Sequence, residues 1–191
     1  MNNVQEESLR EQKKFKRRTL MLATARRIIA TNGLISLKIR DIAEAADCAI
    51  GSVYNEFGDF DGLILTVNRE TVLALTARLK AVPDAAPVRQ LHGLAAVYLE
   101  FASAQANLLR SLFEHRMEED RPFPEDILRM VMQAFELMHP PLARLMFSAV
   151  HGIISLGLEE RMVAVPPDQL SRQLAEFIDT HLAGLGVKTA H

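Results

Sequence analysis

The sequence has 191 residues, of which 49% are hydrophobic, so it can form a packed core and is not a disordered protein. Its 22 lysine and arginine residues nearly balance 24 aspartate and glutamate residues, and the net charge of -2 does not by itself indicate a polyanionic partner. The single cysteine excludes an intramolecular disulfide, and no apolar run approaches the roughly 20 residues that span a bilayer. Because the segment from Met1 to Gln12 is polar and lacks the apolar stretch of a signal peptide, we expect a cytoplasmic protein without membrane contact.

Charge is distributed unevenly along the chain. Residues 1–58 carry ten basic and seven acidic side chains, whereas the remainder is acidic. The interval from Lys13 to Arg40 holds nine lysine and arginine residues and no aspartate or glutamate. Such a block suits a phosphate backbone, but basic side chains also form the solvated face of many helices. A motif beside the block is needed to decide between these two interpretations.

Apolar residues recur with helical spacing along nearly the whole chain, and no sustained period-two alternation indicates a strand. We therefore predict an all-α fold. The first helix is expected from about Lys13 to Asn32, with Gly33 as its C-terminal cap. Its buried stripe is expected to consist of Phe15, Leu22, Ala25 and Ile29.

Two short helices are predicted to follow. The first is expected to bury residues at positions i, i+3, i+4 and i+7, namely Ile39, Ile42, Ala43 and Ala46. The second repeats this spacing with Ile50, Val53, Tyr54 and Phe57. Only Asp47, Cys48 and Ala49 separate the two helices, which is typical of a helix-turn-helix.

The rest of the chain is predicted to be helical apart from turns and one exposed loop over residues 118–124. Glycine and proline positions delimit helices over residues 61–81, 87–104, 108–113, 124–139, 140–161 and 167–184. The last two helices are apolar over a wider arc than one core face requires, so a partner subunit is expected to cover the excess.

The stretch from Ala23 to Leu63, ATARRIIATNGLISLKIRDIAEAADCAIGSVYNEFGDFDGL, resembles the DNA-binding domain of TetR-family regulators. The resemblance is carried by an ordered set of landmarks: Gly33, Ile42, Ala43, Ala46, Gly51, Val53, Tyr54, Phe57 and Leu63. It implies an all-α protein in which a three-helix DNA-binding domain with a helix-turn-helix precedes a helical-bundle regulatory and dimerisation domain. It also implies a homodimer that binds a pseudo-palindromic double-stranded DNA operator.

The resemblance assigns roles to individual residues of this domain. The second short helix becomes the recognition helix, Tyr54 extends its hydroxyl towards a phosphate, and Arg40 reaches a base edge or a phosphate. The predicted DNA-binding residues are Lys14, Arg17, Arg18, Lys38, Arg40, Ala49, Ile50, Ser52, Tyr54 and Asn55. The basic segment from Lys13 to Arg18 is expected to act as a flexible arm.

Three positions depart from the family pattern. Asp47 replaces the usual turn glycine, and because aspartate tolerates left-handed backbone geometry we expect the turn to survive. Phe60 replaces a lysine that commonly contacts phosphate, so one backbone contact is missing. Glu56 lies on the recognition helix, where its carboxylate would either accept a hydrogen bond from cytosine N4 or repel phosphate.

The C-terminal half carries a second resemblance. The stretches YLEFASAQANLLRSLF and RLMFSAVHGIISLGLEERM resemble the regulatory domain of a TetR subgroup with a Trp-His-Gly run, with Phe147 in place of the tryptophan. This implies a dimer interface made by the last two helices, with Gly152, Ser155 and Gly157 permitting close contact. The predicted interface residues are Phe147, His151, Ile154, Leu158, Leu170, Leu174, Phe177 and His181.

The middle helices of this family enclose an inducer cavity, and their polar and aromatic residues are therefore ligand-pocket candidates: His92, Tyr98, His115, Met132, Phe135 and His139. Core or surface positions are the alternative for each. The histidine spacing predicts no metal site, no cofactor other than a small-molecule inducer is expected, and no catalytic motif indicates an enzyme.

We therefore predict three segments: a flexible tail over residues 1–12, a helix-turn-helix domain over 13–60, and a ligand-sensing and dimerisation domain over 61–191. The predicted function is a ligand-responsive transcriptional repressor. The alternative is a degenerate helix-turn-helix interaction module that does not bind DNA, and it rests on Asp47 and Phe60.

Overall fold

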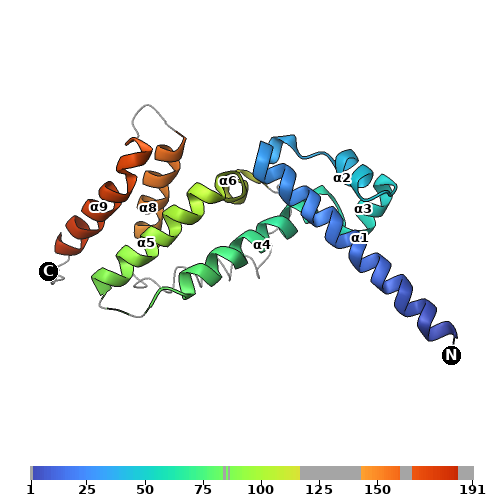
Figure 1. Ribbon diagram of the computed structural model, residues 1–191. Coiled ribbons are helices and arrows are strands. Elements are labelled where there is room, and N and C mark those ends of the chain that lie inside the picture. Colours follow the sequence, from blue (N-terminus) through green and yellow to red (C-terminus); the bar gives the residue numbers. More distant parts are fainter. Residues whose placement is uncertain (1, 84, 86, 117–142, 160–164, 185–191) are drawn as a thin grey trace. The chain divides into compact units, whose positions relative to one another are not determined.

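The computed structural model describes residues 2–83, 85, 87–116, 143–159 and 165–184, and every regular element among them is helical (Figure 1). The chain divides into two compact units. The N-terminal unit contains the chain up to Thr71 and the segment that begins at Asn107. The C-terminal unit begins at Val72 and contains the stretch to Ala106 together with the last helices.

The N-terminal unit is built on a long first helix. Helix α1 (Asn2–Asn32) is followed by a short 3-10 turn η1 (Leu34–Ser36), α2 (Ile39–Ala45), α3 (Ile50–Phe57), the first part of α4 (Phe60–Lys80), and most of α6 (Ala106–Glu114). Its core contains residues from every one of these α-helices, among them Met21, Ile29, Ile42, Val53, Leu63, Val67 and Leu108. Burial of this apolar surface is the main force that holds α2 and α3 against α1.

The predicted start of α1 and one residue of its stripe differ from the structure. The helix begins at Asn2 and not near Lys13, so residues 2–12, expected as a flexible tail, are helical. Leu22, Ala25 and Ile29 are buried as expected, but Phe15 is 72% exposed because it lies before the first turn that packs on the core.

A buried polar contact joins α4 to α6 within the same unit. Ser111 Oγ donates to Asn68 Oδ1 at 2.9 Å, and Asn68 Nδ2 donates to the Ser111 carbonyl oxygen at 3.3 Å. Both side chains are buried, so the reciprocal pair satisfies groups that would otherwise be costly to remove from water.

The C-terminal unit packs α5 (Pro87–Ala104) against α8 (Ala143–Leu158) and α9 (Leu170–Gly184), with the short turn η2 (Pro167–Gln169) before α9. Ala95, Met146, Ile178 and Leu182 form a buried cluster among the three helices. The bounds of α5 agree with the predicted helix over residues 87–104, whereas the predicted helix over 124–139 lies outside the described residues. None of the described helices is long and apolar enough to cross a membrane.

Aromatic and imidazole rings join α5 to α8. The Tyr98 hydroxyl lies 2.7 Å from His151 Nδ1, and the Phe147 ring stacks on the His151 ring with centroids 5.5 Å apart. Burial raises the pKa of Tyr98 far above its ordinary value, which keeps the hydroxyl protonated and available as a donor. Burial also lowers the pKa of His151, an effect that nearby Glu159 opposes.

Candidate nucleic-acid interface

Helices α2 and α3 are joined by a tight turn whose geometry depends on Asp47. This residue has φ of 46°, in the left-handed region, and is the one such non-glycine residue among those described. The Asp47 N–H donates to the Glu44 carbonyl oxygen at 3.1 Å, and the Cys48 N–H donates to the Ala43 carbonyl oxygen at 3.0 Å. The turn therefore survives with aspartate in place of glycine, as expected from the tolerance of aspartate for this geometry.

Helix α3 buries one face and exposes the other. Val53 is 1% exposed and anchors the helix, whereas Ile50 and Tyr54 are 43% and 41% exposed. The prediction that Ile50 and Tyr54 share the buried stripe is therefore wrong: Val53 is buried and the half-buried Phe57 packs against the core, whereas Ile50 and Tyr54 lie on the outer face. Ala49, Gly51 and Asn55 are also exposed, so a contiguous outer face is available to a partner.

The exit from α3 is fixed by two glycines and one carboxylate. Gly58 has φ of 83°, and its N–H donates to the Tyr54 carbonyl oxygen at 2.7 Å. Asp59 Oδ1 then accepts the Gly62 N–H at 2.7 Å, which caps the first turn of α4. A Cβ atom on Gly62 would overlap the Phe57 carbonyl oxygen, so only glycine lets α4 begin this close to the end of α3.

The predicted cationic residues occupy two kinds of position. Lys38, at the N-cap of α2, Arg40 and Arg17 are all exposed. Lys14 and Arg18 are exposed as well, but they also contact the end of α3. Lys14 Nζ lies 3.8 Å from Glu56 Oε1, and the Arg18 guanidinium lies 5.0 Å from the centroid of the Phe57 ring.

The contacts between α1 and α3 were not among the predicted features of the domain. The spacing of the residues could have predicted them, because Lys14 and Arg18 lie eight and four residues before Leu22 and therefore lie on the same side of α1 as its buried stripe. The two departures at Glu56 and Phe60 also acquire a structural explanation. The Glu56 side chain is 7% exposed and faces Lys14, and Phe60 packs against the core. The two predicted roles of Glu56 towards DNA stay predictions.

The ligand-pocket candidates do not form one site among the described residues. His92 Nε2 lies 2.8 Å from Asp179 Oδ1 of α9, and Tyr98 pairs with His151. His115 belongs to the N-terminal unit, where its Nε2 lies 3.5 Å from Asp61 Oδ1. The other candidates, Met132, Phe135 and His139, lie outside the described residues.

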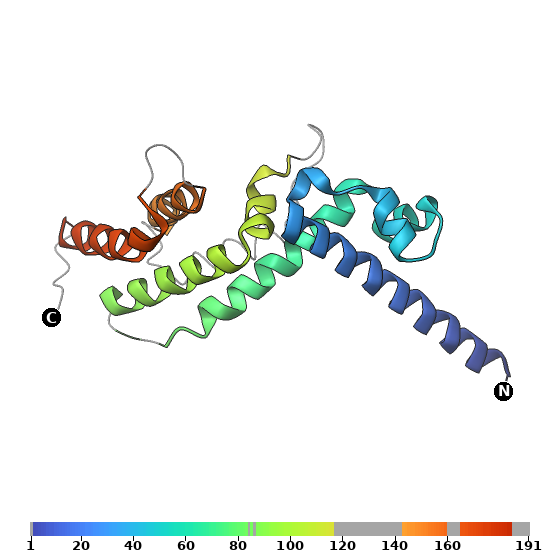
Figure 2. The same cartoon turned by 45° about the horizontal axis from the view of Figure 1, so that its top comes forward.

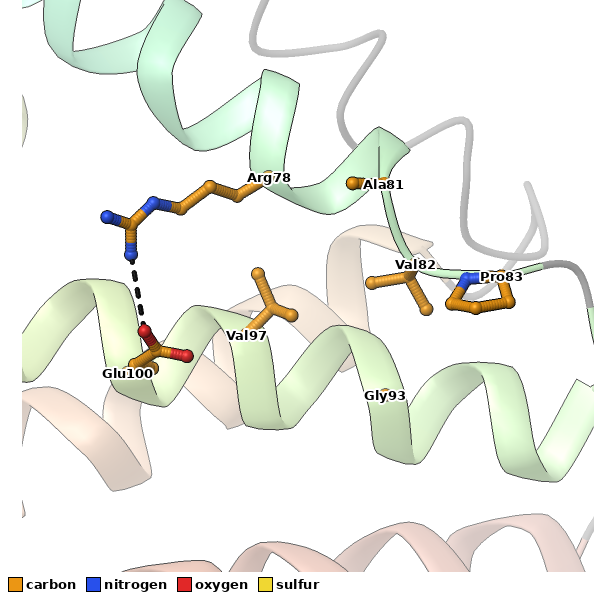
Figure 3. A pocket seen from close by; sticks show the side chains of 7 residues that line it. All are labelled: Arg78, Ala81, Val82, Pro83, Gly93, Val97 and Glu100. Carbon is orange, nitrogen blue, oxygen red and sulfur yellow. Dashed lines mark ion pairs between the residues drawn. The ribbon is translucent and has the colours of Figure 1, made fainter.

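A groove of about 430 Å³ lies elsewhere, between the end of α4 and α5 (Figure 3). Its walls are mostly apolar, and at one end Arg78 Nη1 lies 3.6 Å from Glu100 Oε1. The lining residues are Arg78, Ala81, Val82, Pro83, Gly93, Val97 and Glu100, none of which was a predicted pocket residue.

The predicted dimer residues divide by exposure. Ile154, Leu170 and Leu174 are buried within this chain, while Phe147, His151, Leu158, Phe177 and His181 are half-buried. Gly157 lies against the Leu170 side chain, so its lack of a side chain serves packing inside the protomer. The exposed apolar residues of α8 are instead Leu145 and Leu156, at 58% and 43% exposure.

One part of the chain matches a known protein family. Residues 21–67 match the model of the family described as bacterial regulatory proteins, tetR family, which agrees with the predicted resemblance and with the expectation of a regulator rather than an enzyme. No curated protein matches the chain.

Solved structures share its architecture. A protein of unknown function from Rhodococcus sp. RHA1 has a TM-score of 0.71 and 20% identity, covering 87% of this chain and 95% of its own. A transcriptional regulator from the same organism has a TM-score of 0.67 and 22% identity, with 87% and 96% covered. NalD, the secondary repressor of the MexAB-OprM multidrug efflux pump in Pseudomonas aeruginosa, has a TM-score of 0.59 and 21% identity, with 86% and 94% covered. The predicted all-α fold is confirmed by these likenesses.

Proposed function

We propose that the chain, whose residues 21–67 match the model of the tetR family of bacterial regulatory proteins, is a sequence-specific transcriptional repressor. It binds a pseudo-palindromic operator as a homodimer and releases it when a small molecule binds. The observation that carries the proposal is the outward face of α3, which is anchored by buried Val53 and stands beside exposed cations of α1 and α2. A short, anchored helix whose outer face combines apolar side chains with the polar groups of Tyr54 and Asn55 is able to enter a major groove and contact base edges there.

The residues of this face divide into two roles. Asn55 presents an amide that is able to pair with adenine, and Ile50 offers an apolar surface to a thymine methyl group. Ala49 and Ser52 lie at the start of the same helix and would approach neighbouring base edges. Tyr54 would donate its hydroxyl to a phosphate, which positions the helix without reading sequence.

The cations supply affinity. Lys38 and Arg40 flank the start of α2 and are exposed, so each would contact a phosphate, with Arg40 also able to reach a base edge. In a dimer the two recognition helices would enter successive major grooves, whose centres lie roughly 34–36 Å apart. The exposed leucines of α8, Leu145 and Leu156, support association through that helix.

Ligand response is the second part of the proposal. The groove between α4 and α5 has a volume within the range of small-molecule sites, and it combines apolar walls with one ion pair. Helix α4 begins in the N-terminal unit and ends in the C-terminal unit. A ligand whose affinity for the groove differs between two positions of α4 would therefore shift the population of the DNA-binding state. NalD, which shares the fold, is a repressor, and this favours repression over activation.

Selection of bound sequences from a random DNA pool by the full chain tests the proposal. Enrichment of an inverted repeat is expected. Gel-shift titrations over a salt series should then give a steep slope, and Arg40→Ala should reduce both the affinity and the slope, by about 0.9 in slope for one lost phosphate contact. Arg89→Ala removes the same charge from an exposed position on α5 and serves as the control.

Two outcomes would contradict the proposal. Unchanged affinity and slope in Arg40→Ala would remove Arg40 from the interface. Absence of any enriched sequence, together with no binding at low salt, would instead favour the interaction module without DNA binding.

A further inference from the structure

Residues 8–20 of α1 contribute no side chain to the core of the N-terminal unit. Residues 8–20 are all exposed, and both Figure 1 and Figure 2 show this end of the helix extending past α3. An isolated helix as short as residues 8–20 is only marginally stable in water. The direction of this part of α1 therefore depends on the few side chains that contact the rest of the domain.

Those ties come from Lys14 and Arg18. They continue the stripe of α1 that faces the core, and both contact the last turn of α3: Lys14 approaches Glu56, and Arg18 lies over Phe57. The Glu56 side chain is 7% exposed and the Lys14 side chain is 67% exposed, so the cation approaches a largely buried carboxylate from the solvent side at 3.8 Å. An ion pair between two exposed groups would contribute far less.

Other cations of the same segment are left on the outside. Lys13, Lys16 and Arg17 follow helical spacing on one face, away from the stripe that holds Lys14 and Arg18, and all three are exposed. The ties to α3 therefore set the angle at which this row of charges stands beside the recognition helix. A row fixed in this way loses less conformational entropy on binding than a flexible arm would.

We propose that Glu56 is a positioning residue for DNA binding: it holds the projecting part of α1 through Lys14, so that Lys13, Lys16 and Arg17 form a fixed row of contacts to the phosphates that flank the operator half-site. The occupant of this surface is the DNA backbone, which the charge of the row selects. The inference rests on the proposed function, and it replaces the predicted flexible arm of Lys13 to Arg18 by a helical segment whose direction Glu56 fixes.

The direction in which one substitution changes operator affinity distinguishes this proposal from a purely repulsive effect of the Glu56 carboxylate on phosphate. Removing a carboxylate from a DNA-binding surface normally strengthens binding, because repulsion of phosphate falls. Glu56→Gln is instead expected to weaken operator binding by about threefold to tenfold at low salt, and to lower the salt slope by about 1 to 3, because up to three phosphate contacts are lost. Glu44→Gln removes an exposed carboxylate from α2 and should leave binding unchanged or strengthen it.

A double-mutant cycle supplies the second measurement. Lys14→Gln combined with Glu56→Gln should bind no more weakly than the weaker single variant, because each substitution breaks the same tie. Hydroxyl-radical footprints should lose protection at the flanking phosphates in Glu56→Gln and keep it in the half-site, a change that a general loss of folding would not produce. A Lys13→Gln, Lys16→Gln, Arg17→Gln variant, which alters only exposed residues, should reproduce both effects.

The outcomes separate the inference from the proposed function. Operator binding by Glu56→Gln that equals or exceeds that of the unmodified chain overturns the inference and leaves the repressor proposal intact. The inference is also overturned if the triple variant keeps both the salt slope of operator binding and the footprint at the flanking phosphates. If the unmodified chain enriches no sequence and binds no DNA, both fail.

Discussion

Replacing Gly62 by alanine tests the connection that sets the direction of α3 relative to α4. The added Cβ would overlap the carbonyl oxygen of Phe57, which is backbone and has little freedom to move. Overpacking against fixed atoms costs up to about 3 kcal/mol, while the helix propensity gained from glycine to alanine returns at most about 1 kcal/mol. The net loss of unfolding free energy is therefore about 2 kcal/mol, or about 10 °C in Tm for a unit of this size.

Gly51→Ala is the matched control. Gly51 also lies in the first turn of a helix, but a Cβ atom there would have no other atom within 4 Å. Alanine should stabilise the domain by a few tenths of a kcal/mol, up to about 1 kcal/mol. Thermal unfolding followed by circular dichroism gives the two shifts, and hydrogen exchange of peptides from α2 to α4 assigns them to the N-terminal unit. Equal shifts in the two variants would show that α3 and α4 do not approach as closely as the structure has them.

Three further substitutions or conditions test other contacts. Asp47→Ala should lower the unfolding free energy, measured in urea, by about 1 kcal/mol, because the φ of 46° at this position suits aspartate better than alanine. Asp47→Gly removes the same charge and should be neutral or stabilising. Equal losses of unfolding free energy in the two variants would contradict the turn geometry. Tyr98→Phe should lower the unfolding free energy by about 0.5 to 1.5 kcal/mol, because it removes the 2.7 Å hydrogen bond between the Tyr98 hydroxyl and His151 Nδ1. A loss below about 0.3 kcal/mol would contradict that bond. Burial lowers the pKa of His151 and of His115 below the ordinary 6.5, so the unfolded chain binds more protons below that value and stability should fall as pH drops below about 6.5. Urea midpoints at pH 7.5 and 5.5 measure this fall, which a His115→Gln, His151→Gln double variant should reduce.

The helical pattern was predictable where burial and turn residues coincide. Helix α5 has the predicted bounds because Pro87 favours the first helical position and an apolar stripe follows it. The beginning of α1 was missed for the opposite reason: residues 2–12 carry helix-forming side chains but no stripe, and periodicity detects only the face that becomes buried.

Side-chain partners were less predictable than helices. A stripe of apolar residues has the same appearance whether it packs within one chain or between two, so Ile154, Leu170 and Leu174 were assigned to a dimer interface although they are buried within the protomer. The sequence identified Lys14 as a cation, but only the fold brings it to Glu56, which lies more than forty residues away in the chain.

The departures from the family pattern bear on one physical question, namely which cations hold the phosphate backbone. The resemblance places a lysine at the position of Phe60, and here that residue packs its ring on the core while Asp59 and Asp61 flank it, so the start of α4 presents no cation. The cations concentrate instead on α1, and Glu56 and Phe57 hold that helix through Lys14 and Arg18. An aromatic residue at position 60 is thus compatible with DNA binding if the row of Lys13, Lys16 and Arg17 supplies the missing backbone contact. Phe60→Lys, compared with Phe60→Gln, which loses the same packing on the core without adding a charge, should then strengthen binding more in the Glu56→Gln background than in the unmodified chain, because the two groups of cations would substitute for each other.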